Sequence, residues 1–278
     1  MSNTRDNLRV LCVGDVVGPA GCATFQRNID RICRDYMIDV VVANGENSGA
    51  RGRGITSRLV KFFKHNRVDV ITTGNHVWSE REIYDHFAEL PYLLRPANYP
   101  SECPGSGLYV FTCATGHTVA VINLQGLIFM RDHLACPFKT AEVLLKVAKE
   151  QTDIVIIDMH AEATSEKIGL AYFLDGQVSA VVGTHTHVQT ADERILPKGT
   201  AFISDLGMVG AYDAMLGLKK EPIIHHLLTQ MPTRFVVETE GPMIMCGACI
   251  QIDTKTGKAE RIERICLEDG GVPIDAGQ

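Results

Sequence analysis

Short apolar runs rich in β-branched residues recur through this chain, and they do not alternate regularly between apolar and polar side chains. A strand with one face in water alternates, whereas a parallel strand buried on both faces is a continuous apolar run. Helix-like segments separate several of the runs, which predicts an α/β fold with helices packed on a central sheet. The five runs occupy residues 10–14, 40–45, 68–74, 154–159 and 181–184.

Each of these runs is followed at once by side chains that can bind a metal ion. Ligands in open α/β sheets bind beyond the carboxyl ends of the strands, so five such ends indicate one shared site. We therefore predict a metal-centred active site at this edge. Its candidate ligands are Asp15, Glu46, Asn47, Asn75, His160, His185 and His187.

The chemistry of these seven side chains narrows the choice of metal. Carboxylates, amide oxygens and imidazoles without a thiolate suit Mn, Fe, Co or Zn, and they argue against a closed structural zinc site. Seven ligands exceed the needs of one tetrahedral ion, whereas two ions that share a bridging carboxylate would use them all. Two such ions, roughly 3.5–4 Å apart, can hold a bridging hydroxide for in-line attack at phosphorus. Their net positive charge would attract a phosphodiester.

Each candidate ligand also has a structural explanation when it is taken alone. Asp15 can cap a helix, Gly45 and Asn47 can belong to a turn, and His160 can be a core histidine. The pair His185 and His187, at the end of one strand, is harder to explain without a metal. Because five strand ends agree, the metal site is the better interpretation.

Composition limits the class of protein. The chain has 278 residues, 45% hydrophobic and 22% charged, and its net charge is -6. These values are ordinary for a globular protein, and without repeats or linkers we expect a single domain over residues 1–278. An acidic chain with scattered Lys and Arg is not expected to bind duplex nucleic acid. No phosphate-loop or dinucleotide fingerprint is present, so ATP and dinucleotides have weak support.

The sequence also predicts a cellular location. No run approaches the roughly 18 apolar residues of a membrane helix, and no signal peptide is recognised, so we expect no membrane association. Nine irregularly spaced cysteines suit a reducing compartment. We expect a cytoplasmic protein, and the sequence leaves open whether copies associate into a homo-oligomer.

Capping residues and periodicity predict the remaining elements. Helices are expected over residues 20–35, 57–65 (capped by Thr56), 79–88 (capped by Ser79), 138–150 and 165–174 (capped by Thr164). A β-hairpin is expected from residues 108–113 and 118–123, and antiparallel strands are expected over residues 235–238, 243–253 and 259–266.

At the strand ends, five motifs resemble those of calcineurin-like metallophosphoesterases, in the same order. They are Gly14-Asp15, Gly45-Glu46-Asn47, Gly74-Asn75-His76, His160 and Gly183-Thr184-His185-Thr186-His187. The sequence is most similar to the YmdB-like phosphodiesterases of bacteria, because longer stretches match across nearly the whole chain. These stretches are residues 14–18, 44–47, 74–76, 95–98, 123–126, 160–167 and 182–190.

The resemblance implies a layered metallophosphoesterase fold with central mixed sheets flanked by helices. It implies two metal ions, iron or manganese, with Glu46 bridging them. The first ion would be held by Asp15, Glu46, Asn47 and His187, and the second by Glu46, Asn75, His160 and His185. His76 would be the catalytic residue that protonates the leaving alkoxide, a role that suits the pKa of an imidazole.

The resemblance further implies a small phosphodiester substrate, 2′,3′-cyclic AMP being characteristic of the family. Relative to the wider superfamily, the usual Asp-x-His is Asp15-Val16-Val17 here, and Asn47 is a candidate for the missing ligand. Two alternative functions remain open: a phosphomonoesterase of the same fold, or a regulator that binds metal and nucleotide without turnover.

Several further residues have competing interpretations. Two interpretations remain open for four cationic residues: they contact phosphate, or they are solvated or paired with another side chain on a helix. These residues are Arg51, Arg53, Arg95 and Lys167. Asp205 is a candidate for orienting a ligand histidine. Cys246 and Cys249 have the spacing of a redox or zinc motif, but no second pair accompanies them, so core packing is favoured.

Overall fold

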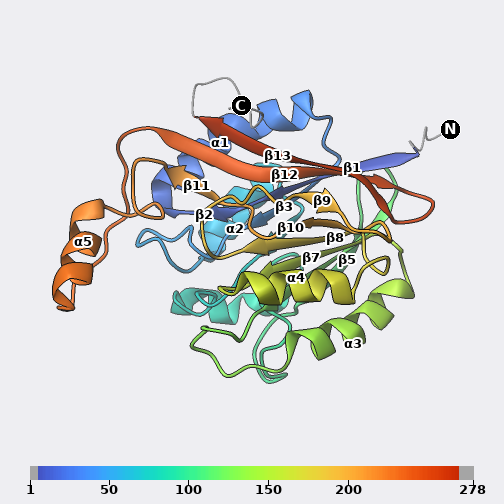
Figure 1. The fold of residues 1–278 in the computed structure, drawn as a ribbon, viewed down its shortest axis with the longest axis horizontal. Coiled ribbons are helices and arrows are strands. Elements are labelled where there is room, and N and C mark those ends of the chain that lie inside the picture. The colour runs from blue at the N-terminus through green and yellow to red at the C-terminus, as the bar shows by residue number, and fades with distance from the viewer. Residues whose placement is uncertain (1–5, 269–278) are drawn as a thin grey trace.

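Two β-sheets pack face to face, and helices cover the outer face of each sheet (Figure 1). The structure is a computed structural model that describes residues 6–268. Both sheets are mixed, so the predicted α/β class with mixed sheets flanked by helices is confirmed. The single domain over residues 1–278 stays a prediction, and residues 1–5 and 269–278 lie outside the described part of the chain.

The first sheet has the strand order β2-β11-β12-β1-β3-β4, with β13 also paired to β12. Strands β1, β3 and β4 run parallel, whereas β12 is antiparallel to β1, β11 and β13. The strands are β1 (Asn7–Val13), β2 (Asp15–Val16), β3 (Val40–Asn44), β4 (Val70–Thr72), β11 (Met208–Ala211), β12 (Met243–Asp253) and β13 (Ala259–Glu268).

The second sheet has the strand order β5-β6-β7-β8-β10-β9. Its four central strands are parallel, and the antiparallel strands β5 and β9 lie at the edges. The pairing of β5 with β6 confirms the predicted hairpin. The strands are β5 (Leu108–Thr112), β6 (Thr118–Gln125), β7 (Val155–His160), β8 (Ala180–Thr184), β9 (Arg194–Ile195) and β10 (Ala201–Ile203).

Strand β1 shows why the apolar runs lack alternation. Val10 and Cys12 face the layer between the two sheets, whereas Leu11 and Val13 belong to the layer under helix α1 (Gly18–Asp35). Both faces of the strand are therefore buried in apolar surroundings, and an apolar residue is favoured at each position. The same arrangement places the carboxyl ends of the parallel strands of each sheet at one edge.

The α-helices are α1 (Gly18–Asp35), α2 (Ser57–His65), α3 (Pro137–Lys149), α4 (Thr164–Phe173) and α5 (Lys220–Thr229). The first four agree closely with the sequence-based ranges, and α5 has no counterpart among those ranges. Thr56 caps α2 as predicted, because its hydroxyl accepts from the Leu59 N–H at 3.4 Å. Thr164 is instead the first residue of α4, and Ala163 occupies the cap position without a side-chain bond.

The predicted helix over residues 79–88 is wrong. The segment forms two short 3₁₀-helices, η1 (Arg81–Asp85) and η2 (Phe87–Glu89). The Trp78 ring packs on the rings of both Tyr84 and Phe87. These tertiary contacts hold the chain in tighter turns than a continuous α-helix allows.

The predicted strand over residues 235–238 is also wrong. Only Val237 of this segment is buried, and it forms a single bridge to Leu218. Without a continuous buried face the segment has no sheet to extend, and Phe235 lines a cavity instead. The other C-terminal strands, β12 and β13, are confirmed.

Cys246 and Cys249 are buried residues of β12, which confirms core packing for both. The Cys246 Sγ atom lies 3.6 Å from the Cys266 Sγ atom on β13. Among the helices between residues 6 and 268, none has the length and apolar character needed to cross a membrane.

Candidate metal centre

The predicted metal ligands lie where strands of the two sheets end. Asp15 begins β2 directly after β1, and Glu46, Asn47 and Asn75 follow β3 and β4 of the first sheet. The remaining three come from the second sheet. His160 ends β7, while His185 and His187 follow β8.

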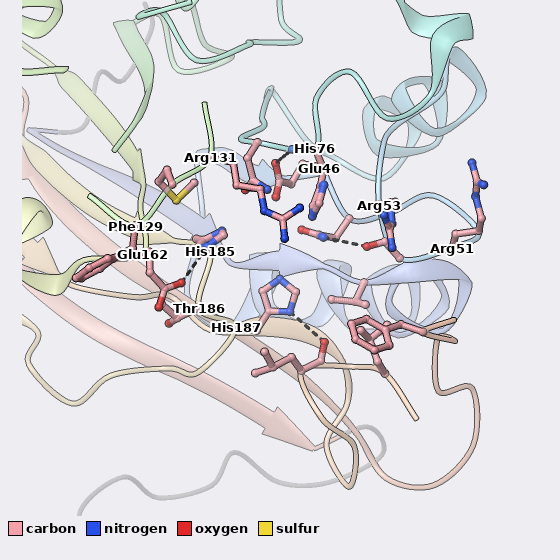
Figure 2. Close-up of a pocket in the computed structure, with 18 of the residues that line it drawn as sticks. Glu46, Arg51, Arg53, His76, Phe129, Arg131, Glu162, His185, Thr186 and His187 are labelled. Carbon is pink, nitrogen blue, oxygen red and sulfur yellow. Dashed lines mark hydrogen bonds and ion pairs between the residues drawn. The ribbon is translucent and has the colours of Figure 1, made fainter. Parts of the chain in front are cut away.

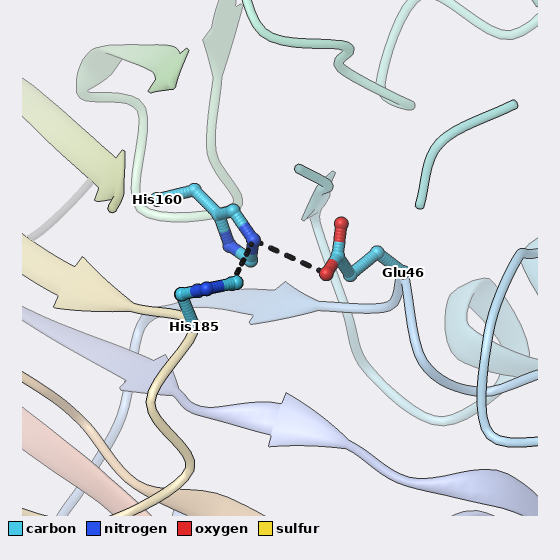
Figure 3. A group of neighbouring side chains, drawn as sticks. All are labelled: Glu46, His160 and His185. Atoms are coloured by element: carbon cyan, nitrogen blue, oxygen red, sulfur yellow. Dashed lines mark hydrogen bonds and ion pairs between the residues drawn. The ribbon is translucent and has the colours of Figure 1, made fainter. Parts of the chain in front are cut away.

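Glu46, His160 and His185 form the closest group (Figure 3). The His160 Nε2 atom lies 3.1 Å from Glu46 Oε1 and 3.1 Å from His185 Nδ1. One candidate ligand atom from each of the three residues lies within 4.8 Å of the other two, which is a separation that a shared metal ion can span.

Asn75 brings a fourth atom to the same point, because its Oδ1 atom lies 2.9 Å from His160 Nε2. One ring nitrogen carries at most one proton, so it cannot satisfy Glu46, Asn75 and His185 together. A cation among these four atoms would satisfy them all. The donor set therefore fits a metal ion.

A second group lies beside the first. Asp15 Oδ2 accepts from the His185 backbone N–H at 3.1 Å, and Asp15 Oδ1 lies 3.8 Å from His187 Nε2. Asp15 Oδ1 and Asn47 Oδ1 are buried and have no hydrogen-bond partner among the described residues. Unsatisfied buried oxygens are costly, and a second cation would pair with them.

The other face of His160 is held by a chain of hydrogen bonds. The Thr184 hydroxyl donates to Asp158 Oδ1 at 2.8 Å, so its oxygen is left to accept from His160 Nδ1 at 2.9 Å. Thr72 donates its hydroxyl to the second oxygen of Asp158. With the proton on Nδ1, the Nε2 lone pair of His160 is directed to the metal position.

Sequence reasoning missed Asp158, Thr184 and Thr72 in this role. The sequence contains a signal for this role, because each of the three is a polar residue in a mostly apolar strand. Each of them is buried in the structure. Buried polar side chains of this kind require partners, and here the partners lead to a candidate ligand, His160.

The backbone that carries His185 and His187 is strained. Their φ angles are 101° and 64°, in the left-handed region that side chains other than glycine rarely adopt. Asp205 holds this turn: its Oδ2 atom accepts from the Thr186 N–H at 3.0 Å and from Lys167 Nζ at 2.9 Å. Asp205 thus acts on the backbone between the two histidines and not through a bond to either ring.

Burial and charge set the protonation of the group. Burial raises the pKa of Glu46, but the attraction of His160 outweighs it and the pKa falls to about 2. Burial lowers the pKa of His160, but Glu46 outweighs it and the pKa rises to about 9. For His185, burial and then His160 lower the pKa to about 3, so this ring is neutral. Burial raises the pKa of Asp15.

His76 stands beside the ligands. Its backbone N–H donates to Glu46 Oε2 at 3.0 Å, and its side chain lines the cavity above the site. Burial is the main cause that lowers the pKa of the His76 ring. A lower pKa makes the protonated form of this ring a stronger acid, and that imidazolium form is the one that can donate a proton.

A cavity of about 750 Å³ opens over this group (Figure 2). Its wall contains three cations, Arg51, Arg53 and Arg131, and several apolar side chains. Sequence reasoning proposed the first two and missed Arg131. The apolar wall residues are Val17, Phe129, Met130, Leu216, Leu218 and Phe235.

Arg95 and Lys167 do not line the cavity. Arg95 is buried and donates to three backbone carbonyls, of Pro96, Cys103 and Pro104. Lys167 is buried in its ion pair with Asp205. Both cations have structural roles here.

A profile of the YmdB-like protein family matches residues 11–265, which include every candidate ligand. The chain belongs to this family. A 2′,3′-cyclic-nucleotide 2′-phosphodiesterase of Bacillus subtilis (strain 168) is 46% identical to this YmdB-like chain over 262 residues. That match covers 94% of this chain and 98% of the relative.

Two solved structures are similar over nearly all of the YmdB-like chain. A hypothetical protein from Thermus thermophilus is 37% identical, with a TM-score of 0.86 over 94% of this chain and 100% of the other. A novel phosphatase from Mycoplasma pneumoniae is 32% identical, with a TM-score of 0.88 over 97% of this chain and 95% of the other. The YmdB-like family and the layered metallophosphoesterase fold predicted from the motifs are confirmed.

Proposed function

We propose that this YmdB-like protein is a metal-dependent phosphodiesterase that hydrolyses 2′,3′-cyclic nucleotides, with 2′,3′-cyclic AMP as the first candidate substrate. The name of the Bacillus subtilis relative supports the reaction. The structural observation that carries the proposal is the convergence of Glu46, Asn75 and His185 on His160 Nε2 below an open cavity.

We propose that the site holds two metal ions, with Glu46 between them. Iron and manganese suit the mixed oxygen and imidazole ligands, and zinc or cobalt is compatible with them. One ion would be held by Asp15, Glu46, Asn47 and His187, and the other by Glu46, Asn75, His160 and His185. The orphaned oxygens of Asp15 and Asn47 support the first of these positions.

When bound, the two metal ions supply a hydroxide nucleophile at neutral pH and neutralise charge on the phosphate. The residues of the chain hold the ligand side chains in position. Thr184 and Asp158 fix the ring of His160, and Asp205 fixes the turn that carries His185 and His187. The contacts of His160 are buried and that of the turn is partly buried, so water competes little for them.

We propose His76 as the general acid. Hydrolysis adds hydroxide to phosphorus and breaks one ester bond, and the departing ribose oxygen takes a proton from the His76 ring. The name of the relative points to the bond at O2′, which would leave a 3′-phosphate. The ring then regains a proton from solvent through the open cavity.

The size of the cavity favours a diester of nucleotide size. Pockets for small molecules range over about 300–1,000 Å³, and 750 Å³ leaves room for a ribose and a base beyond the phosphate. Apolar and cationic side chains share the wall, which suits a ligand with both a base and an anionic group.

The test is hydrolysis by protein of measured metal content, with 2′,3′-cyclic AMP, bis-p-nitrophenyl phosphate and p-nitrophenyl phosphate. We expect about two metal ions per chain and faster turnover of both diesters than of the monoester. Preference for p-nitrophenyl phosphate would make the protein a phosphomonoesterase. Bound metal and nucleotide with no turnover above metal-free protein would make it a regulator.

We also propose that the protein works in the cytoplasm. All nine of its cysteines are free thiols, and five that are buried on strands or helices pack as small apolar side chains: Cys12, Cys22, Cys33, Cys246 and Cys249. Such usage suits a reducing compartment. Fractionation of cells that produce the protein would test this location.

A further inference from the structure

Arg131 reaches over the candidate metal centre from a loop that no sequence motif singled out. Figure 2 shows its guanidinium group above the middle of the cavity, between His185 and Arg53. Over residues 6–268 the structure shows neither a hydrogen bond nor an ion pair from Arg131 to a protein group. The cation therefore faces the cavity with its donors free for a ligand.

The loop that carries Arg131 is anchored at its start. It connects β6 to α3, and the buried carboxylate of Glu166 accepts from the N–H groups of Leu127, at 2.9 and 3.1 Å, and Ile128, at 3.2 Å. Glu166 belongs to α4, which packs on the second sheet. The first turn of the loop is thus attached to the body of the fold.

The end of the loop is anchored as well. The Asn98 side-chain amide donates to the carbonyl of Gln125, at 2.8 Å, and to that of Ala135, at 3.0 Å, so it joins the two ends. The neighbour of Arg131, Asp132, accepts from Gln125 Nε2 at 3.0 Å. Because both ends are held, the loop backbone loses little conformational entropy when Arg131 meets a ligand, and the entropic cost falls mainly on the Arg131 side chain.

The two other cavity arginines are placed differently. Arg51 lies at the rim and is paired with Glu80 at 3.5 Å. Arg53 lies near the general acid, since its charge is among the causes that lower the pKa of His76. Arg131 is the cation set over the ligand cluster itself.

Guanidinium groups bind phosphate with paired hydrogen bonds of fixed geometry. Hydrolysis of a phosphodiester turns a singly charged group into a monoester with more negative charge. A fixed cation beside that phosphate gains interaction energy as the charge grows, so it favours the transition state over the bound substrate.

We propose that Arg131 is a substrate-contacting residue whose guanidinium binds the phosphate oxygens that the metal centre leaves free. The proposal rests on the function proposed above for the site, and it adds a specific phosphate contact to it. It assigns to the loop after β6 the task of holding the anion against the ligand cluster.

The experiment compares Arg131→Gln and Arg131→Lys with Arg58→Gln as the matched control, all loaded with metal. Arg58 is exposed on α2 and is not part of the cavity wall. For bis-p-nitrophenyl phosphate we expect Arg131→Gln to lower kcat/KM roughly 10- to 100-fold, as loss of a charge-assisted hydrogen-bond pair predicts. Arg131→Lys keeps the positive charge but lacks the paired N–H donors of the guanidinium group, so it should retain part of the activity. Arg58→Gln should change kcat/KM less than about twofold, because it alters an exposed side chain away from the cavity.

A second readout is competitive inhibition by inorganic phosphate. We expect its inhibition constant to rise roughly 10-fold in Arg131→Gln while metal content and Tm stay unchanged, because the residue is exposed. Unchanged kcat/KM and phosphate inhibition in metal-loaded Arg131→Gln would overturn the proposal. So would equal losses in Arg58→Gln.

The two proposals fail in different ways. If the wild-type protein hydrolyses no phosphodiester, the proposed contact between Arg131 and phosphate is still tested by measuring phosphate binding with calorimetry. Phosphate affinity lost in Arg131→Gln then supports the anion contact without the proposed function, and unchanged or undetectable phosphate affinity overturns both.

Discussion

The Glu46 carboxylate and the His160 imidazole meet beneath the cavity, with Oε1 and Nε2 3.1 Å apart and both side chains almost fully buried. Without metal, each of these groups is the main compensation for the charge of the other. Burial of an unpaired charge is expensive, so the pair is stable only while both groups are ionised.

This pair predicts a pH dependence for metal-free protein. The pKa of Glu46 falls from 4.5 to about 2, so its contribution is present above pH 4.5 and is lost as the pH falls through about 2. The pKa of His160 rises from 6.5 to about 9, so its contribution is present below pH 6.5 and is lost as the pH rises through about 9. Urea unfolding of chelator-treated protein should therefore show lower stability at pH 9 than at pH 6.

The matched control for that prediction is the double variant Glu46→Gln with His160→Gln, which removes both charges. Its unfolding free energy should vary less between pH 6 and pH 9 than that of the wild-type protein. An identical pH dependence in both proteins would show that the pair is not its source.

Metal should stabilise the fold, because it binds the native ligands and not the unfolded chain. At a free metal concentration 100-fold above Kd, one site contributes about 2.7 kcal/mol. For a chain of this size that corresponds to a rise in Tm of roughly 5–10 °C. Thermal unfolding with Mn²⁺ and with chelator measures the shift. The same rise in Glu46→Gln would place the metal elsewhere.

Gly74 should not accept a side chain. A Cβ atom at this position would lie 2.1 Å from His160 Cδ2 and 2.2 Å from His160 Nε2. Gly74→Ala must therefore displace the His160 ring. We expect the affinity for metal to fall at least about tenfold, as it does when the orientation of a metal ligand is disturbed. Metal titration followed by elemental analysis measures this.

Gly169→Ala is the control for Gly74→Ala. In α4 a Cβ atom would meet only Phe138, at an ordinary 3.4 Å. Here we expect unchanged metal affinity and a gain of about 0.4–1 kcal/mol in stability. Full metal retention by Gly74→Ala would show that His160 is not required as a ligand.

His76→Ala should separate substrates by leaving group. Loss of a general acid costs typically 10²- to 10⁴-fold when the leaving oxygen needs a proton, as the ribose oxygen of 2′,3′-cyclic AMP does. Nitrophenolate leaves without protonation, so turnover of bis-p-nitrophenyl phosphate should fall much less. Kinetics with both substrates, at equal metal content, give the comparison. Equal losses, or loss of metal, would remove His76 from this role.

Lys167→Met should destabilise the protein. It leaves the buried carboxylate of Asp205 without its cation, which typically costs about 3–5 kcal/mol. The double variant Lys167→Met with Asp205→Asn removes the unpaired charge and should recover part of that loss in urea unfolding. A double variant no more stable than Lys167→Met would argue against the ion pair as the cause.

The position of the candidate ligands was predictable because they follow strands that are buried on both faces. Such strands leave continuous apolar runs in the sequence, and the residues after them, Asp15, Asn75 and His185 among them, fall at one edge of the fold. The division into two stacked sheets was not predictable from the runs. A buried strand has the same pattern in either sheet, and only its pairing distinguishes them.

Other features depend on tertiary contacts that no local pattern records. The turns at residues 81–89 follow the packing of Trp78, and Phe235 lies on a cavity wall instead of in a strand. Arg131 belongs to a loop without periodicity, whose position is set by the distant residues Glu166 and Asn98. Sequence alone gives such a loop no orientation.

The candidate ligands are divided between the two sheets, with four from the first and three from the second. Neither sheet can form the site alone, so the site exists only after the two sheets have packed together. A bound ion would act as a cross-link between them. Damage to the packing of the middle layer should then be detected as released metal before any secondary structure is lost.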